Sequence, residues 1–472
     1  MRHALLFASG SIALATVVAC ATSSSEEDAR PAPPSDDAGE STVSEPERPA
    51  DAGAPVEDAN VQPPSSCNAV GWCATALPDT NLVLRDIWPL EEGAFALAES
   101  STLGTKVLEW TESTKSWAYI DDDSQNAYGA GHYAGKVWAP NENEVYYATA
   151  PALIYHGTRA TPSSPFSWES TRLEYVGPDH GPDRDPGYAW QLKDTSAAQN
   201  GLPYIKQHVA AVGVWGTSAD DVYAWYANRI FRRVRVDGGS PAWVPEHVEE
   251  NPSAPHESFY IFGAAGSSRD EVWFVSSHGL YNAQSGFYGC STLIRRTPDG
   301  YRRVVDSCGA EGSLRVTQGS SGTAYWTELG WPTSVDSPRP GTAVIVVNNR
   351  AFVYVDMTGA GKARFNPVNG ADPPVVVGRT KPNLQSVWIN GDRAWFSGWG
   401  LVIDGENKPD AWAESYGLQP PKAAPDGGAT FSISSTALDG APLDKPLYQV
   451  RGTSNDNLWA VGSGYALHKK TP

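Results

Sequence analysis

Three aspartates occupy the same position in a phrase that the sequence repeats. Each copy joins a glycine, small or hydroxyl residues, an aspartate four places after the glycine, and an apolar–aromatic pair. The copies begin at Gly216, Gly266 and Gly452 and carry Asp220, Asp270 and Asp456. Carboxylates repeated around a ring could bind calcium. The alternative, which we favour, is that each aspartate accepts backbone N–H bonds within its own turn.

A second acidic cluster, Asp121-Asp122-Asp123-Ser124, lacks the glycine and the distal glutamate of a calcium loop. We interpret it as a solvated turn.

Four of the five cysteines form two local pairs, Cys67 with Cys73 and Cys290 with Cys308. Local pairs fit disulfides made in an oxidising compartment. Four cysteines allow three connectivities, and a single domain favours the near neighbours. A zinc site is the alternative, but no C-x-x-C occurs and neither pair has a histidine at zinc-finger spacing. We therefore predict two disulfides, no metal and no cofactor.

The segment 177–190 is the part of the sequence best suited to touch a ligand. It places acids, a histidine, an arginine and two aromatics on a proline-stiffened loop, which suits carbohydrate or peptide recognition. An ordinary packed insertion is the alternative. The candidate binding residues are His180, Asp183, Arg184, Asp185, Tyr188 and Trp190.

No catalytic residue is predicted. The phrase Gly319-Ser320-Ser321-Gly322 lacks the spacing of a nucleophile elbow, and neither a P-loop nor a dinucleotide fingerprint occurs.

The elements that would position these residues are short strands. From about residue 70, β-branched and aromatic runs alternate with Gly, Asn, Asp and Pro. Exact and looser copies of the phrase begin near residues 87, 137, 214, 264, 316, 387 and 450, and blades of four strands need about 40 to 50 residues. The spacing predicts an all-β fold, a β-propeller over 67–472 with seven blades, six to eight being open. The surplus length predicts insertions near 157–208, 328–384 and 404–447, as long loops on the faces of the disc.

The C-terminus indicates how such a ring would close. After the last copy the chain holds enough residues for one more strand but no complete blade. The stretch from Cys67 to Arg85 can supply the missing outer strand, which removes an exposed sheet edge.

The N-terminus has the features of an export signal over residues 1–19. The tetrad Val17-Val18-Ala19-Cys20 resembles the bacterial lipobox, in which the signal is cleaved before a cysteine that then carries lipid. By this resemblance Cys20 is the lipidated residue, and Ala21 permits transfer to the outer membrane of a Gram-negative cell envelope. A plain secretory signal is the alternative.

Residues 20–66 are expected to form a disordered acidic stalk. The stretch 21–66 holds eleven acidic residues against Arg30 and Arg48, is rich in Pro, Ser and Ala, and cannot bury enough apolar surface to fold. Much of the formal net charge of −19 lies there. The rest is mildly acidic, so binding to nucleic acid is not expected.

The Gly-Thr-Ser-x-x-Asp/Asn-Val/Leu-Trp/Tyr phrase resembles the repeat of secreted bacterial propeller lipoproteins, most of which have no known role. The resemblance implies the fold and transfers no catalytic residue. We predict a lipid-anchored, non-enzymatic binding or scaffold module for a glycan, a peptide or an envelope protein. The alternative is a glycoside hydrolase or lyase with carboxylates at the channel mouth, supported by fold analogy alone. A purely structural surface protein is a third interpretation, and the oligomeric state stays open.

Overall fold

The structure is a computed structural model, and its described residues all belong to the compact unit of residues 62–472. They are 67–127, 134–150, 152–174, 188–190, 208–235, 238–251, 257–282, 286–310, 312–318, 323–324, 332–347, 351–367, 384–406, 431–435, 437–438 and 441–470.

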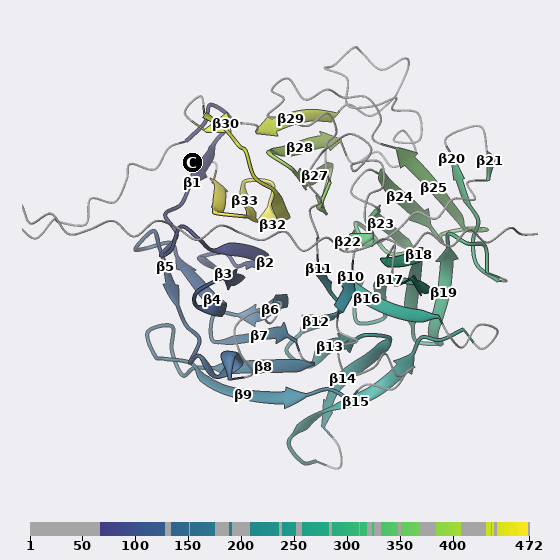
Figure 1. Cartoon of the computed structure of the whole chain (residues 1–472), viewed down its shortest axis with the longest axis horizontal. Helices are drawn as coiled ribbons and strands as arrows, with labels where there is room; N and C mark the ends of the chain where they lie inside the picture. Colours follow the sequence, from purple (N-terminus) through teal and green to yellow (C-terminus); the bar gives the residue numbers. More distant parts are fainter. Residues whose placement is uncertain are drawn as a thin grey trace, which may run out of the picture. The chain divides into compact units, whose positions relative to one another are not determined.

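Seven blades form the fold, each with four antiparallel strands; six of them are four-stranded sheets, and the fifth belongs to a six-stranded sheet (Figure 1). The first three blades follow the chain without exchange of strands. They are β2 (Val83–Pro89), β3 (Gly93–Ser100), β4 (Gly104–Thr111) and β5 (Ser116–Tyr119); β6 (Ala134–Asn141), β7 (Glu144–Thr149), β8 (Leu153–Thr158) and β9 (Ser167–Arg172); and β12 (Val212–Ser218), β13 (Asp221–Tyr226), β14 (Arg229–Arg235) and β15 (Pro241–Val248).

Blades 4 to 6 repeat this order. They are β16 (Ser258–Ser268), β17 (Glu271–Asn282), β18 (Gly286–Thr297) and β19 (Gly300–Asp306); β22 (Pro332–Asp336), β23 (Thr342–Val347), β24 (Ala351–Asp356) and β25 (Lys362–Pro367); and β26 (Ser386–Asn390), β27 (Arg393–Gly398), β28 (Leu401–Glu406) and β29 (Phe431–Ser435).

Blade 7 joins both ends of the described chain. It holds β32 (Leu447–Ser454), β33 (Asn457–Gly462), β34 (Tyr465–Lys470) and, as its outer strand, β1 (Trp72–Ala74). Cys73 pairs with His468 in this register, and a disulfide joins Cys67 to Cys73. The predicted closure is therefore confirmed.

The innermost strands make a closed ring. They contact one another in the order β2, β6, β12, β16, β22, β26 and β32, and β32 contacts β2 again. Side chains of one inner strand accept N–H groups of the next: Asp86 Oδ2 from Val137 at 2.9 Å, and Ser386 Oγ from Val450 at 2.7 Å. The seven-bladed propeller predicted from the repeat spacing is confirmed.

Apolar residues on both faces of the strands fill the space between blades. Tyr223, Trp273 and Trp459 of the repeated phrase are all at most 1% exposed. Strands sandwiched between neighbouring sheets require such two-sided burial, because water reaches neither face.

The structure corrects the position of blade 5. The copy predicted from residue 316 forms only β20 (Val316–Gln318) and β21 (Thr323–Ala324), a short hairpin that extends this blade at its outer edge. The blade itself is β22 to β25, inside the stretch 328–384 that was predicted as an insertion. Thr342–Val347 is buried at every position, which only a central strand explains.

The other two predicted insertions also contain blade strands. The stretch 157–208 includes β9, and 404–447 includes β29 and the short hairpin of β30 (Ala437–Leu438) and β31 (Ala441–Pro442). β9 and β29 each complete a four-stranded blade, so the inserted chain is shorter than predicted. Most of it, including 191–207 and 407–430, lies outside the described residues.

In the repeated phrase, the residue that makes the buried polar contact is the one after the predicted aspartate. Asp220, Asp270 and Asp456 are exposed, and the N–H groups of Asp270 and Asp456 donate to hydroxyls of Ser268 and Ser454, so for these two the described bond runs opposite to the prediction. The following residue is buried in each copy and binds a basic residue on the third strand. These pairs are Asp221 with Arg232, Glu271 with Arg295 and Asn457 with His468, at 2.8 to 2.9 Å.

Two looser copies of the phrase also have a side-chain pair between the second and third strands of their blade. Glu144 binds His156 at 3.0 Å, and in blade 6 the charges are reversed, with Arg393 on β27 and Asp404 on β28. In the first case the basic ring also stacks on the aromatic residue opposite it, Tyr146, with centroids 4.3 Å apart.

The cluster at residues 121–124 is not a solvated turn throughout. Asp121 has a side chain only 1% exposed; its Oδ1 binds Lys106 Nζ at 3.1 Å and its Oδ2 accepts the Val107 N–H at 2.9 Å. It is an ion-paired structural turn.

Within the described residues, no helix is long and apolar enough to cross a membrane. The single helical element there is the short 3-10 turn η1 (Ser124–Asn126).

Candidate ligand-binding face

One face of the ring carries two connections of every blade. In each blade the loop before the inner strand and the turn between the second and third strands lie on the same side, because the strands alternate in direction. We call this side the entry face.

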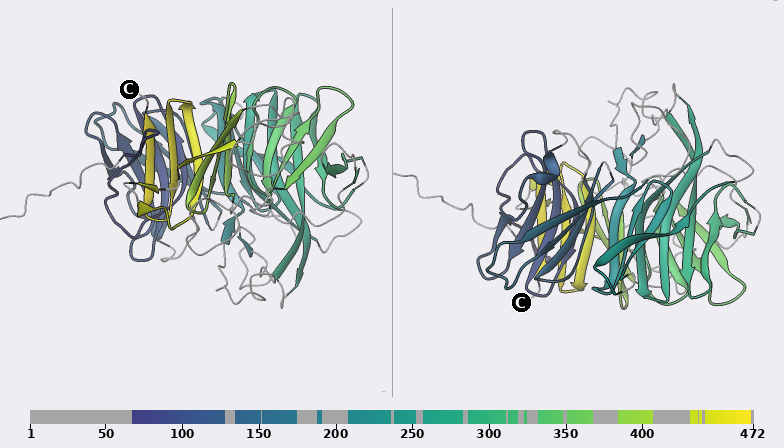
Figure 2. Two further views of the ribbon diagram at one scale, coloured as in Figure 1. Left: turned by 90° about the horizontal axis from the view of Figure 1, so that it is seen from above. Right: turned by 90° about the horizontal axis from the view of Figure 1, so that it is seen from below.

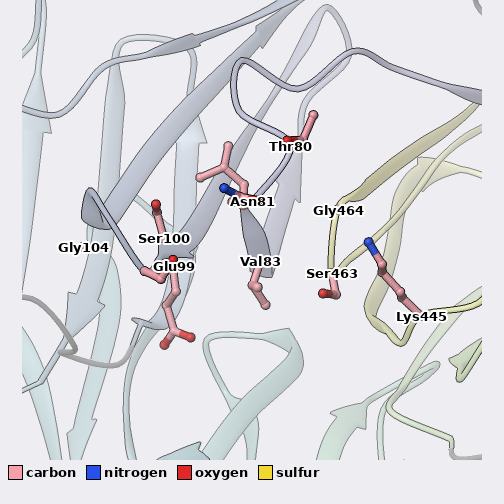
Figure 3. A pocket seen from close by; sticks show the side chains of 11 residues that line it. Thr80, Asn81, Val83, Glu99, Ser100, Gly104, Lys445, Ser463 and Gly464 are labelled. Atoms are coloured by element: carbon pink, nitrogen blue, oxygen red, sulfur yellow. The ribbon is translucent and has the colours of Figure 1, made fainter. Parts of the chain in front are cut away.

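A pocket of about 540 Å³ opens on the entry face where blade 7 meets blade 1 (Figure 3). We call it the seam pocket. Its floor is backbone: the Gly464 N–H donates to the Leu82 carbonyl at 2.9 Å, and Val83 bridges Ser463. Its walls include Thr80, Asn81, Ser100, Ser101, Lys445 and Gly464.

The wall from blade 1 is a turn held by a side chain from η1. Asn126 Oδ1 accepts the Thr105 N–H at 2.9 Å, and Asn126 Nδ2 donates to the Leu103 carbonyl at 3.1 Å. Gly104 has φ +74°, and a Cβ there would lie 2.3 Å from Asn126 Oδ1. Only glycine at this position leaves room for the Asn126 side chain and its hydrogen bonds to the turn.

The acidic residue that lines the pocket, Glu99, already has an ion-pair partner. Glu99 binds the Arg85 guanidinium at 2.6 Å and accepts the Ala134 N–H at 2.8 Å. Burial lowers the pKa of Arg85, but the Glu99 carboxylate outweighs it and the net shift is upward. Arg85 therefore stays charged, and its ion pair with Glu99 adds no net charge to the pocket.

Lys445 is the cation without such a partner. It is exposed, and no carboxylate within the described part of the chain forms an ion pair with its ammonium group. Its backbone is fixed, since the Gly400 N–H donates to the Lys445 carbonyl at 3.1 Å and the neighbouring Asp444 carboxylate accepts the Tyr465 hydroxyl at 2.9 Å.

Gly464 keeps space beside this ammonium. It adopts φ +70°, and a Cβ there would lie 3.4 Å from Lys445 Nζ and 3.5 Å from the Thr80 carbonyl oxygen. The chemistry of the pocket is thus one free cation beside hydroxyls and backbone groups, which suits a carboxylate or another small anion.

A second feature of this face is the β17–β18 hairpin. These strands have 12 residues each, and they run past the ends of their neighbours (Figure 2). The Cys290–Cys308 disulfide ties β18 to the chain after β19, so both predicted disulfides are confirmed.

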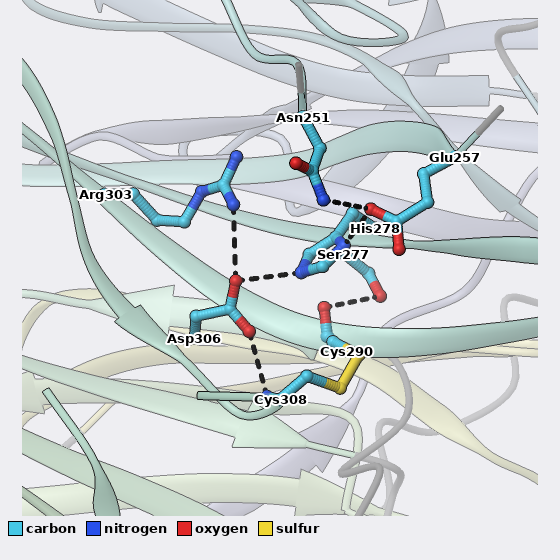
Figure 4. Close-up of a disulfide and its surroundings, with 8 residues drawn as sticks. All are labelled: Asn251, Glu257, Ser277, His278, Cys290, Arg303, Asp306 and Cys308. Atoms are coloured by element: carbon cyan, nitrogen blue, oxygen red, sulfur yellow. Dashed lines mark hydrogen bonds and ion pairs between the residues drawn. A yellow bond between two sulfur atoms is a disulfide. The ribbon is translucent and has the colours of Figure 1, made fainter. Parts of the chain in front are cut away.

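Buried charges lie beside this disulfide (Figure 4). His278 Nδ1 binds Glu257 Oε2 and His278 Nε2 binds Asp306 Oδ2, both at 2.8 Å. Burial lowers the pKa of His278, but hydrogen bonds and charges from Asp306 and Glu257 outweigh it, so the pKa is raised. The pKa of Asp306 is lowered, because His278 outweighs the effect of burial.

The network continues outward through Arg303. Its guanidinium binds Asp306 Oδ2 at 3.3 Å and the carboxylate of Glu249, which in turn contacts His247 Nε2 at 2.9 Å. His247, Glu249 and Arg303 border a smaller pocket of about 280 Å³.

Of the predicted binding residues, Tyr188 and Trp190 belong to β10 (Tyr188–Trp190), which pairs with β11 (His208–Ala210). β10 contacts β18, so the predicted segment reaches the projecting hairpin. The positions of His180, Asp183, Arg184 and Asp185 lie outside the described residues, so their role stays a prediction.

The central channel is narrow. The cavity between Asp86, Lys136, Trp225 and Arg451 measures about 20 Å³, room for roughly one water molecule. A sugar ring does not fit in this cavity. The predicted glycoside hydrolase or lyase alternative places its carboxylates at the mouth of the channel instead, so it stays a prediction.

Sequence comparison finds no relative: no family model matches the chain, and no match was found among curated proteins. Solved structures do match. YCF48 bound to D1 peptide is 13% identical with a TM-score of 0.50, over 86% of this chain and 99% of that chain. The fold is a β-propeller. YCF48 from Cyanidioschyzon merolae (11% identical, TM-score 0.48, 85% and 98% covered) and the WD40 propeller domain of Doa1 (9%, 0.46, 85% and 97%) also match. At such identities the likeness is one of fold.

The sequence did not single out Lys445 or Glu99. They lie at opposite ends of the propeller sequence, and only the predicted closure of the ring, which places 80–83 beside 445–464, could have brought them together.

Proposed function

We propose that this chain is a lipid-anchored extracytoplasmic binding propeller that holds a carboxylate-bearing peptide segment of a protein partner in the seam pocket. The observation that carries this function is the Lys445 ammonium, which faces a polar pocket without an ion-pair partner among the described residues.

A peptide suits the seam pocket better than a glycan does. Sugar sites commonly stack a ring on an aromatic side chain, and no aromatic residue lines the seam pocket. Backbone groups and hydroxyls from Thr80, Ser101 and Ser463 instead match the alternating donors and acceptors of an extended peptide. The D1 peptide bound by the similar YCF48 structure is consistent with this use of the fold, but the pocket chemistry carries the proposal.

Binding of a carboxylate would use a charge-assisted hydrogen bond from Lys445. Such bonds contribute about 1.5 to 3 kcal/mol, or roughly a tenfold to hundredfold change in affinity. Because the site is open to solvent, salt should weaken it.

The test is a peptide-array screen with the full chain carrying Cys20→Ser, followed by titration of the best peptides. Lys445→Gln should weaken binding at least tenfold. The matched control is Lys115→Gln, in the turn between β4 and β5 on the opposite face, also without an ion pair among the described residues. Equal binding by both variants, or peptides selected without a carboxylate, would contradict the proposed site.

A further inference from the structure

Donor atoms of three residues from different strands meet beside the second disulfide (Figure 4). One donor atom each from His278, Cys290 and Asp306 lies within 4.8 Å of the others. β17 and β18 place His278 directly opposite Cys290 in register, and Asp306 ends β19. Cys308 adds a second sulfur, since it is bonded to Cys290.

We propose that reducing the Cys290–Cys308 disulfide converts this cluster into a zinc site, with Cys290, Cys308, His278 and Asp306 as the four ligands. The disulfide and the metal are then alternative crosslinks at the base of the β17–β18 hairpin. The site is separate from the seam pocket and does not depend on it.

The donor set is one that zinc accepts. Two thiolates, one imidazole and one carboxylate complete a tetrahedral shell at about 2.3 Å for sulfur and about 2.0 Å for nitrogen and oxygen. In that geometry the ligating nitrogen and oxygen lie about 3.3 Å apart. His278 Nε2 and Asp306 Oδ2 are 2.8 Å apart in the disulfide form. These two atoms therefore need to move only slightly apart to bind the ion.

The surrounding residues already hold these ligands as a metal site requires. His278 directs Nε2 to Asp306 while Nδ1 binds Glu257, and Asn251 Nδ2 donates to Glu257 Oε2 at 2.9 Å. A carboxylate on the far nitrogen of a ligating histidine fixes its tautomer and raises its basicity. The second oxygen of Asp306 accepts the Cys308 N–H at 2.9 Å.

A bound dication would offset the negative charge of the ligands. Two thiolates would add two negative charges beside Asp306 and Glu257, where the basic groups are Arg303 and His278. Zinc binds cysteine as the thiolate, so it replaces the thiol protons of the reduced chain.

The conversion has two steps. A dithiol attacks the disulfide and is oxidised to its cyclic disulfide while Cys290 and Cys308 are reduced to thiols. Zinc then displaces both thiol protons and the proton on His278 Nε2, and the buffer accepts them. Cys308 is exposed and Cys290 half-buried, so a small dithiol can reach the bond.

The test measures metal binding by the full chain carrying Cys20→Ser, oxidised or reduced with dithiothreitol that is then removed under anaerobic conditions. Cobalt(II) should give thiolate charge-transfer and tetrahedral visible bands in the reduced chain alone, at one ion per chain, and zinc should displace it. Zinc should also protect Cys290 and Cys308 from alkylation.

Variants assign the ligands. His278→Gln and Asp306→Asn should each weaken zinc binding at least tenfold, and Glu257→Gln by about 10- to 100-fold. His156→Gln is the matched control, because His156 makes a similar carboxylate contact with Glu144 in blade 2. Circular dichroism verifies folding of each variant.

Two outcomes would overturn the assignment. One is a folded, reduced chain that gives no thiolate–cobalt band. The other is a band that persists in Cys290→Ser/Cys308→Ser, which would place the metal at Cys67 and Cys73.

Discussion

The two polar residues that end each turn phrase have separate roles. The exposed aspartate, as in Asp270, lies in the turn, whereas the next residue is buried and reaches outside it. Glu271 accepts the Gly341 N–H of blade 5 with both oxygens, at 2.8 and 2.9 Å. Asn457 Nδ2 donates to the Leu90 carbonyl of blade 1 at 3.3 Å. The repeat therefore links neighbouring blades as well as shaping a turn.

His468 is the basic partner in the closing blade, and it is held neutral. Burial lowers its pKa from 6.5 to about 4, which Lys470 and Lys115 reinforce and Glu112 opposes. The ring stacks on Trp459 with centroids 4.0 Å apart, and its Nε2 contacts Asn457 Oδ1 at 2.9 Å.

We predict that titration of His468 lowers the stability of the fold in acid. The folded pKa lies below the unfolded value, so the unfolded chain binds a proton first and stability falls as the pH drops from about 6.5 to about 4. His468→Gln, which keeps a donor but does not titrate, should flatten the unfolding free energy over that range by about 3 kcal/mol.

Chemical denaturation at pH 7, 5.5 and 4.5 gives the difference between wild type and variant. Parallel pH profiles for the two proteins would show that His468 does not titrate as described.

The buried acids show why the roles of single residues could be predicted only in part. The repeat marked the position of the turn, but Asp220 and Asp221 are adjacent and chemically alike, and only packing shows which is buried. Lys445 has no repeat counterpart at all. Its importance depends on a pocket made by two distant segments, which no local pattern encodes.

At the scale of elements, β1 is short but closes the ring. Trp72 is fully buried and meets Trp395 of blade 6 edge-on, with ring centroids 6.2 Å apart. Thr75 extends the connection, because its N–H and hydroxyl both donate to the Ala466 carbonyl at 2.9 and 2.8 Å.

Deleting residues 67–76 should therefore open the ring. The edge of β34 and the apolar cavity left by Trp72 would be exposed, so we expect a broad, less cooperative thermal transition at lower temperature. Circular dichroism melting measures it, with a deletion of 22–60 as the control. A melting curve unchanged by loss of β1 would contradict closure by this strand.

The wrong position predicted for blade 5 shows that a buried strand indicates a blade better than a turn phrase does. The glycine–hydroxyl turn that resembles the phrase belongs to the edge hairpin β20–β21. The run Thr342–Val347 instead carries the signal of a central strand, a continuous apolar stretch. Its turn, Pro338 to Gly341, lacks the phrase, so the sequence predicts this blade through its buried strand and not through its turn.

At the scale of the whole molecule, the number of blades followed from repeat spacing because each blade is one unit stacked on two neighbours. The lipobox resemblance predicts a further property, attachment of the chain to a membrane through Cys20.

That anchoring is tested by expressing the chain in a Gram-negative host. We expect it in the membrane fraction with a lipid-modified N-terminal cysteine detectable by mass spectrometry, because one diacylated cysteine buries enough methylene groups for stable attachment. Cys20→Ser should move it to the soluble fraction. An unmodified, soluble wild type would support the plain secretory signal instead.

The short disulfide next to β1 determines where tension along the chain would act. Any pull on the segment ahead of Cys67 passes through the sulfur bridge to Cys73 and bypasses residues 68–72. Cys73 is paired with His468, so the force arrives in the middle of the strand pair that closes the ring. Under the proposed anchoring, the propeller would yield first at this pair in blade 7. The seam pocket, which blade 7 lines together with blade 1, would then be the first site to lose its proposed ligand under load.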